Sequence, residues 1–194
     1  MKMLHLVTNR KLIPDGNIFR VIEECVNAGI DSIILREKDL SYDELYNIAK
    51  EIKLIADKKS VPLIINGTLD VARDLKCHGF HTGFNCIKNK LPDFDGIIGV
   101  SIHSVEEAIQ AQNLGANYII AGHIFPTDCK KGLEPRGTDF IKKIKQNVEI
   151  PIICIGGINE TNIKKVYESG SNGVAVMSSI MKSDNIYNTV HNLK

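Results

Sequence analysis

A histidine and two lysines follow one short apolar run of the chain. The run 117–121 reads as a buried strand, and His123 lies where that strand becomes a loop. The loop carries further polar side chains, among them Thr127, Lys130 and Lys131. An imidazole with a pKa of about 6.5 can both donate and accept a proton near neutral pH. We interpret His123 as a catalytic acid/base residue, and the alternative is a histidine that only satisfies loop carbonyls.

Two cations follow another apolar run. In the segment from Ile34 to Lys38, the period-two alternation of a strand places Arg36 and Lys38 on one face with Ile34, and Glu37 on the other. Arg36 and Lys38 would then receive a carboxylate or phosphate of a substrate. Asn66, after the next run, can donate an amide hydrogen bond to the same group. The alternative is a charged strand end that water simply solvates.

Two turns with small side chains follow the last two apolar runs. Gly156 and Gly157 leave the backbone open to an anion, and Met177 and Ser178 stand at the next strand end. Backbone N–H groups at a helix start bind phosphate without any basic side chain. We predict a phosphate site at these two turns, and the alternative is a tight turn with a capped helix.

The elements that must position these residues are short and alternate along the chain. Several apolar runs are nearly continuous in Ile and Val, as strands covered on both faces require. The runs are 4–7, 32–35, 63–65, 79–81, 97–100, 118–121, 152–155 and 173–176. With helical patterns between them, they predict a compact (β/α)8 TIM barrel, a single domain over 1–194. A doubly wound sheet is the alternative, but its GxGxxG fingerprint is missing.

Such a barrel brings the ends of its strands to one rim. Arg36, Asn66, Ser101, His123 and Gly157 each lie within two residues of a predicted strand end. Active sites of this architecture are built at that rim. The sequence therefore predicts one shared site in the barrel mouth.

Composition restricts the partners of the chain. Its 24 Lys and Arg against 23 Asp and Glu give a net charge of +1, so we expect no nucleic-acid partner. No stretch approaches the roughly 20 apolar residues of a membrane span, and we expect a cytoplasmic protein without membrane contact. The five cysteines lack zinc-site spacing, so no metal is predicted. A homodimer stays open, because no apolar stripe identifies an interface.

The motifs together resemble the thiamine phosphate synthase superfamily, nearly from end to end. The segments that carry this resemblance are Arg36-Glu37-Lys38, Asn66-Gly67, Gly99 to His103, Gly122 to Gly132, Ile155 to Ile158 and Val174 to Ser178. The chain also departs from the synthase pattern. Synthases typically have an aspartate where Gly67 stands and another near Cys86, and these two carboxylates hold the magnesium of a pyrophosphate. They also typically have glutamine in place of Ile34 and proline in place of His123.

The loop from Gly122 to Gly137 is similar to the thiazole tautomerase (TenI-type) branch. That resemblance implies a cofactor-independent isomerase of thiamine biosynthesis, which converts a carboxythiazole phosphate, a phosphate monoester, to its aromatic tautomer. His123 would move the protons. The implied substrate-binding residues are Arg36, Lys38, Asn66, Ser101, Thr127, Lys130, Lys131, Gly157, Met177 and Ser178. Two alternatives stay open: a thiamine phosphate synthase, which is a transferase, and a non-catalytic protein that binds these phosphates.

Overall fold

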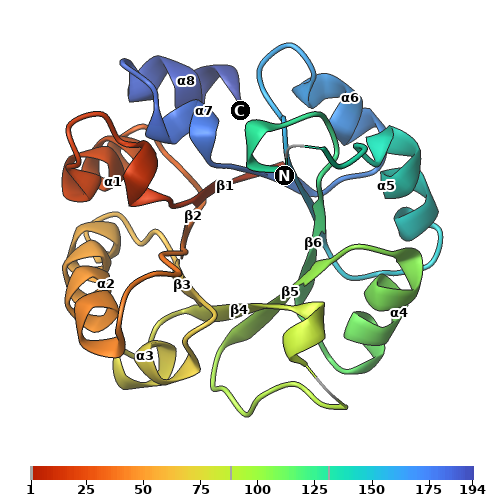
Figure 1. Ribbon diagram of the computed structural model, residues 1–194, viewed down its shortest axis with the longest axis horizontal. Coiled ribbons are helices and arrows are strands. Elements are labelled where there is room, and N and C mark those ends of the chain that lie inside the picture. Colours follow the sequence, from red (N-terminus) through yellow and green to blue (C-terminus); the bar gives the residue numbers. More distant parts are fainter. Residues whose placement is uncertain (1, 88, 131) are drawn as a thin grey trace.

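Eight parallel strands close into a barrel, as Figure 1 shows, in a computed structural model that describes residues 2–87, 89–130 and 132–194. Each strand pairs with its neighbours in chain order, and β8 returns to β1. The strands are β1 (Met3–Val7), β2 (Ser32–Leu35), β3 (Leu63–Asn66), β4 (Gly79–Gly83), β5 (Ile97–Ile102), β6 (Tyr118–Gly122), β7 (Ile152–Ile155) and β8 (Gly173–Val176). The predicted TIM barrel is confirmed, with every strand at its predicted run.

Helices surround the barrel on its outside (Figure 1). They are α1 (Ile18–Asn27), α2 (Tyr42–Asp57), α3 (Leu69–Asp74), α4 (Val105–Asn113), α5 (Gly137–Lys145), α6 (Ile163–Glu168), α7 (Ser178–Met181) and α8 (Ile186–Asn192). Three 3-10 turns are η1 (Arg10–Leu12), η2 (Phe84–Cys86) and η3 (Asp128–Lys130). Local sequence starts some helices directly: the Ser41 side chain accepts from the Glu44 amide, and the Glu44 carboxylate accepts from the Ser41 amide.

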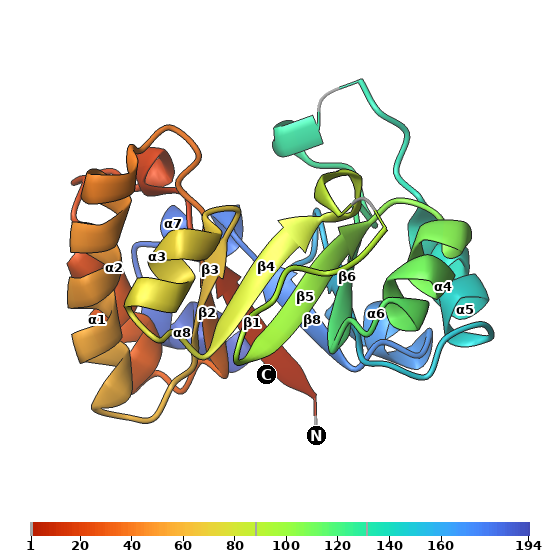
Figure 2. The same ribbon diagram turned by 90° about the horizontal axis from the view of Figure 1, so that it is seen from below.

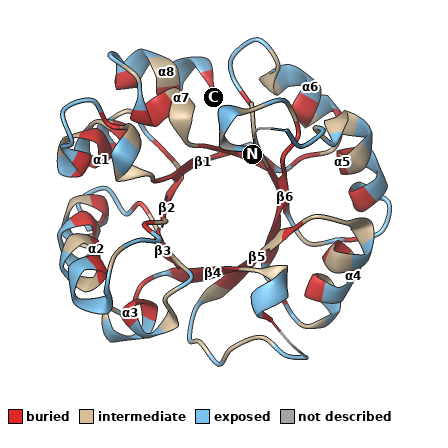
Figure 3. Ribbon diagram, in the orientation of Figure 1, coloured by how far each residue is buried: buried red, intermediate tan, exposed pale blue. Residues whose placement is uncertain are grey.

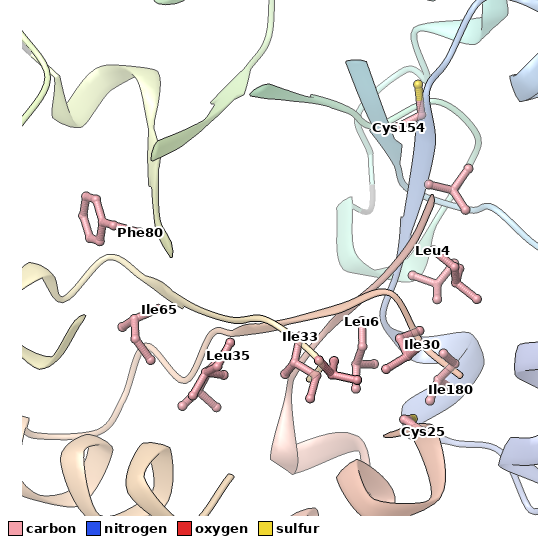
Figure 4. Close-up of a cluster of buried hydrophobic side chains, with 14 of the residues drawn as sticks. Leu4, Leu6, Cys25, Ile30, Ile33, Leu35, Ile65, Phe80, Cys154 and Ile180 are labelled. Carbon is pink, nitrogen blue, oxygen red and sulfur yellow. The ribbon is translucent and has the colours of Figure 1, made fainter. Parts of the chain in front are cut away.

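Alternation along the strands separates two apolar layers. Leu4, Leu6, Ile33 and Leu35 point outward and pack with helix residues such as Ile180 (Figure 4). Each fully buried side chain of this size stabilises the fold by about 1.5–3 kcal/mol. A smaller cluster fills the inside of the barrel, and its buried members are Val7, Ile34, Ile64, Tyr118, Ile120, Ile153 and Ala175. Figure 3 shows the consequence, with the strands buried and the outer helix faces exposed.

The two ends of the barrel differ. The strands point toward the end that carries η1 and the long loop between β6 and α5, while both termini lie at the opposite end (Figure 2). The carboxyl ends of all eight strands therefore form one mouth, as parallel pairing requires. No helix in the described residues is long and apolar enough to cross a membrane.

Candidate functional site in the barrel mouth

Arg36 and Lys38 stand at the end of β2 beside a surface cleft. The Arg36 amide donates to Thr8 Oγ1 at 2.9 Å, which ties the start of this loop to the end of β1. Arg36 is half-buried and Lys38 is exposed. Both line the cleft together with Asn9 and Lys11. The ends of β1 and β2 therefore form a basic flank of the mouth.

Glu37 lines the same cleft as these two cations, but Arg10 binds its carboxylate. It is 5% exposed, and its carboxylate accepts from the Arg10 amide and from Arg10 Nη1, both at 3.0 Å. Arg10 also binds both carboxylate oxygens of Asp39 at 2.8 Å, and these hydrogen bonds hold the pKa of Asp39 well below its usual range. Residues 36–38 lie beyond β2 and Lys38 is in a turn, so the strand alternation expected for them stays a prediction. No sequence pattern indicated Arg10 as the partner of Glu37.

Asn66 and Ser101 meet around a buried histidine on β4. The Asn66 side chain donates to the His81 carbonyl at 3.1 Å, and Ser101 Oγ lies 2.7 Å from His81 Nε2. His81 Nδ1 lies 3.0 Å from the Tyr118 hydroxyl. Gly99 makes this arrangement possible, because a Cβ there would lie 2.0 Å from Tyr118 Cζ. The structure thus brings two predicted site residues together through one histidine that motif analysis missed.

The interior polar layer continues to β1 and β2. His5 Nδ1 is hydrogen bonded to Ser32 Oγ, and the His5 ring stacks near that of Tyr118, with 6.4 Å between ring centroids. Burial lowers the pKa of His5 to about 4 and that of His81 to about 3, because it disfavours the charged imidazole. Strand alternation could have placed both histidines inside the barrel, since each shares a face with interior residues of its strand.

His123 is held under the loop that follows β6. Its side chain is buried, at 6% exposure for the residue, and Nε2 lies 3.2 Å from the Leu133 carbonyl oxygen. The Arg136 amide donates to the His123 carbonyl at 3.0 Å, and Arg136 Nε donates to the Gly122 carbonyl at 3.1 Å. The imidazole therefore satisfies a loop carbonyl, which is the structural alternative that the sequence left open.

Gly156 and Gly157 have a packing role. Both have positive φ, +104° and +65°. A Cβ on Gly157 would lie 2.4 Å from the Pro126 carbonyl oxygen, and one on Gly156 would lie 2.6 Å from His123 Cβ. These glycines let the loop after β6 lie directly against the loop after β7. The sequence analysis explained Gly156 and Gly157 by a bound anion. In the structure, the close approach of the neighbouring loop is sufficient to explain both glycines.

The remaining predicted residues lie in two places. Met177 and Ser178 are half-buried at the end of β8, where Ser178 begins the four-residue helix α7. Thr127 is half-buried and Lys130 is exposed, and the Lys130 amide donates to the Thr127 carbonyl at 3.1 Å within the η3 turn. Lys131 lies outside the described residues.

The resemblance to synthases implies magnesium, and the fit of the residues to that ion can be tested. Gly67 offers no ligand, and the residue at the second position is the exposed Cys86. The nearby carboxylates Glu37 and Asp39 are bound by Arg10. No group of three or more His, Cys, Asp or Glu that could hold a metal exists in ranges 2–87, 89–130 and 132–194. The residues therefore do not fit a magnesium ion held by protein carboxylates.

The fold is a parallel (β/α)8 barrel, an architecture in which phosphate sites after the last two strands are frequent. The sequence profile described as thiamine monophosphate synthase matches residues 4–180. The chain belongs to this family, whose members act on small-molecule phosphates.

Individual relatives cover almost the whole chain. A thiamine-phosphate synthase of Clostridium botulinum (strain Hall) is 40% identical over 195 residues, 98% of this chain and 95% of that protein. One from Clostridium tetani is 41% identical over 187 residues, 94% and 90% of the two chains. The structure of a thiamine phosphate pyrophosphorylase from Pyrococcus furiosus superposes with a TM-score of 0.86 at 29% identity, covering 98% of this chain and 93% of that one.

These relatives correct the expected activity. The two Clostridium proteins are named as synthases, which are transferases, and the Pyrococcus structure as a pyrophosphorylase. The interpretation of the chain as a thiazole tautomerase and isomerase is therefore wrong. The error arose from the weight given to His123 and its loop. The hydrogen bond of His123 to Leu133 gives a physical reason for a histidine there that involves no proton transfer.

Proposed function

We propose that the chain is a thiamine-phosphate synthase, which joins a thiazole phosphate to a pyrimidine pyrophosphate. The observation that carries the proposal is the likeness to synthases at 40% identity over 98% of the chain. The basic flank formed by Arg36 and Lys38 supports it, because a pyrophosphate leaving group needs cations that carry no counter-ion of their own.

The reaction is a substitution at a methylene carbon. The thiazole nitrogen forms a bond to the pyrimidine methylene carbon, the bond from that carbon to a pyrophosphate oxygen breaks, and pyrophosphate leaves with the electron pair. Positive charges aimed at this oxygen stabilise the charge that develops on it, and such electrostatic stabilisation is commonly a large part of catalysis. The main task of the site is therefore to bind and orient two phosphate-bearing substrates.

The site residues divide between the two substrates in this proposal. Arg36, Lys38, Asn66 and Ser101 bind the pyrophosphate, since they share the β2 to β5 side of the mouth. Backbone N–H groups at Gly157 and Ser178, beside Met177, bind the phosphate of the thiazole. Thr127 and Lys130 close the thiazole side, and His123 supports their loop.

The test is the condensation itself. Purified protein is incubated with the thiazole phosphate and the pyrimidine pyrophosphate in a magnesium-containing buffer, and thiamine phosphate is quantified by chromatography beside released pyrophosphate. We expect both products in equal amounts. The Ser101→Ala variant should form them more slowly while its melting temperature stays within a few degrees of the wild type. Absence of thiamine phosphate with a folded wild-type protein would overturn the proposal.

A further inference from the structure

Two carboxylates lie beside the basic flank of the mouth and could neutralise it. Glu37 stands between Arg36 and Lys38 in sequence, and Asp39 follows directly. All four line or border the same cleft. Carboxylates so near to two cations would compete with an anionic substrate for them, because opposite charges about 4 Å apart attract strongly at a partly buried site.

Arg10 holds both of these carboxylates. It binds Glu37 through its amide and Nη1 at 3.0 Å, and Asp39 through Nη1 and Nη2 at 2.8 Å. The Glu37 side chain is 2% exposed and that of Arg10 is 26% exposed, so water screens their pair only weakly. Lys11 adds a second contact to Asp39 at 3.0 Å.

The two mouth cations are left without counter-ions. Among the described residues, the side chains of Arg36 and Lys38 have no hydrogen bond or ion pair. The loop that carries them is anchored twice on the segment after β1, where Thr8 Oγ1 accepts from the Arg36 amide and Arg10 binds Glu37. The same contacts thus fix the loop and occupy its negative charges.

We propose that Arg10 is a positioning residue of the pyrophosphate side, which sequesters Glu37 and Asp39 so that Arg36 and Lys38 stay available to the anion. This inference rests on the proposed function, because pyrophosphate is the leaving group of that reaction. Arg10 itself is directed at the carboxylates and does not touch the substrate.

The test measures binding of inorganic pyrophosphate by calorimetry, which requires no turnover. We expect Arg10→Met to weaken binding about tenfold, since Glu37 and Asp39 can then pair with Arg36 and Lys38. The double variant Arg10→Met with Glu37→Gln should recover most of the loss, because the freed buried carboxylate is gone. The double variant also controls for misfolding of Arg10→Met, because it leaves no unpaired buried charge. Arg10→Lys, which keeps a cation, should bind within about threefold of wild type.

The matched control is Arg20→Met, which removes the same charge from an arginine that also binds two carboxylates, Asp15 at 2.9 Å and Glu24 at 2.7 Å. Its pyrophosphate affinity should not change. Wild-type affinity in Arg10→Met would overturn the inference. The inference would also fail if Arg10→Met bound pyrophosphate more weakly and the double variant did not restore the affinity. It would fail as well if the wild-type protein bound no pyrophosphate.

Steady-state kinetics separate this inference from the proposed function. In the condensation, Arg10→Met should raise KM for the pyrimidine pyrophosphate and leave KM for the thiazole phosphate unchanged. A protein that shows the full calorimetric pattern but forms no thiamine phosphate would support the role of Arg10 and overturn the synthase assignment alone.

Discussion

The two sides of the barrel mouth use their charged and titratable side chains differently. On the β2 to β5 side, Glu37 and His81 are buried and bonded, and the side chains of Arg36 and Lys38 carry no counter-ion in the described chain. On the β6 to β8 side, His123 bonds to a loop carbonyl, and two glycines let neighbouring loops touch. Among the residues that the structure describes, the first side thus leaves two basic side chains unpaired, while the second packs loop backbone against loop backbone.

This difference shows why residue type alone misleads at the mouth. A histidine and an arginine occur on both sides, and each is a plausible catalytic group by its chemistry. Their hydrogen-bond partners separate them: the side chains of His123 and Arg136 are bonded to the carbonyls of Leu133 and Gly122. Within the part of the chain that the structure describes, Arg36 has only its backbone amide bonded.

Acid should destabilise the fold through His5 and His81, the two histidines inside the barrel. The folded pKa values of His5 and His81, about 4 and about 3, lie below the unfolded value of about 6.5, so the unfolded chain binds more protons. Stability is therefore full above about pH 6.5 and falls by several kcal/mol as the pH drops toward 4. Urea unfolding at pH 7, 5.5 and 4.5 measures this change in the free energy of unfolding. His5→Gln should flatten the profile, and the exposed His191→Gln should leave it unchanged.

Gly157→Ala should destabilise the backbone-lined side by about 3 kcal/mol, because its Cβ would collide with Pro126 and Phe125 and its φ is positive. Gly132→Ala is the matched control. Gly132 has φ +79° and nothing within 4 Å of an added Cβ, so it should lose only about 1 kcal/mol. Denaturant melts of both variants give the difference. Equal losses would show that strain, and not the contact between loops, explains Gly157.

Arg36→Met should lower kcat/KM for the condensation about 100-fold, since it removes a charge-assisted contact to the pyrophosphate. Lys11→Met is a fair control at the same cleft, because Lys11 already binds Asp39. It should change kcat/KM by less than about threefold. Initial rates at limiting pyrimidine pyrophosphate check both. An unchanged kcat/KM in Arg36→Met would show that the basic flank is not part of the pyrophosphate site.

His123→Gln should have the smallest effect, within about threefold on the condensation rate, because a glutamine amide can also donate to the Leu133 carbonyl. Its melting temperature should fall by only a few degrees. A rate loss near 100-fold with normal folding would place His123 in the chemistry, and the contrast between the two sides would fail.

The sequence by itself determined the barrel and the composition of its rim. Nearly continuous Ile and Val runs at regular spacing define strands covered on both faces, and their order leaves the barrel as the simplest closed arrangement. These features are local, so they depend only on neighbouring residues.

Only the tertiary structure decided which of those residues stay available. Arg10 and Glu37 are 27 residues apart and bond at 3.0 Å, Ser101 meets His81 across two strands, and Leu133 accepts from His123 across a loop. No local pattern encodes such pairs, because barrel closure brings them together. A buried polar group must find a partner, and in this protein the partner determines whether a reactive side chain stays available or supports the fold.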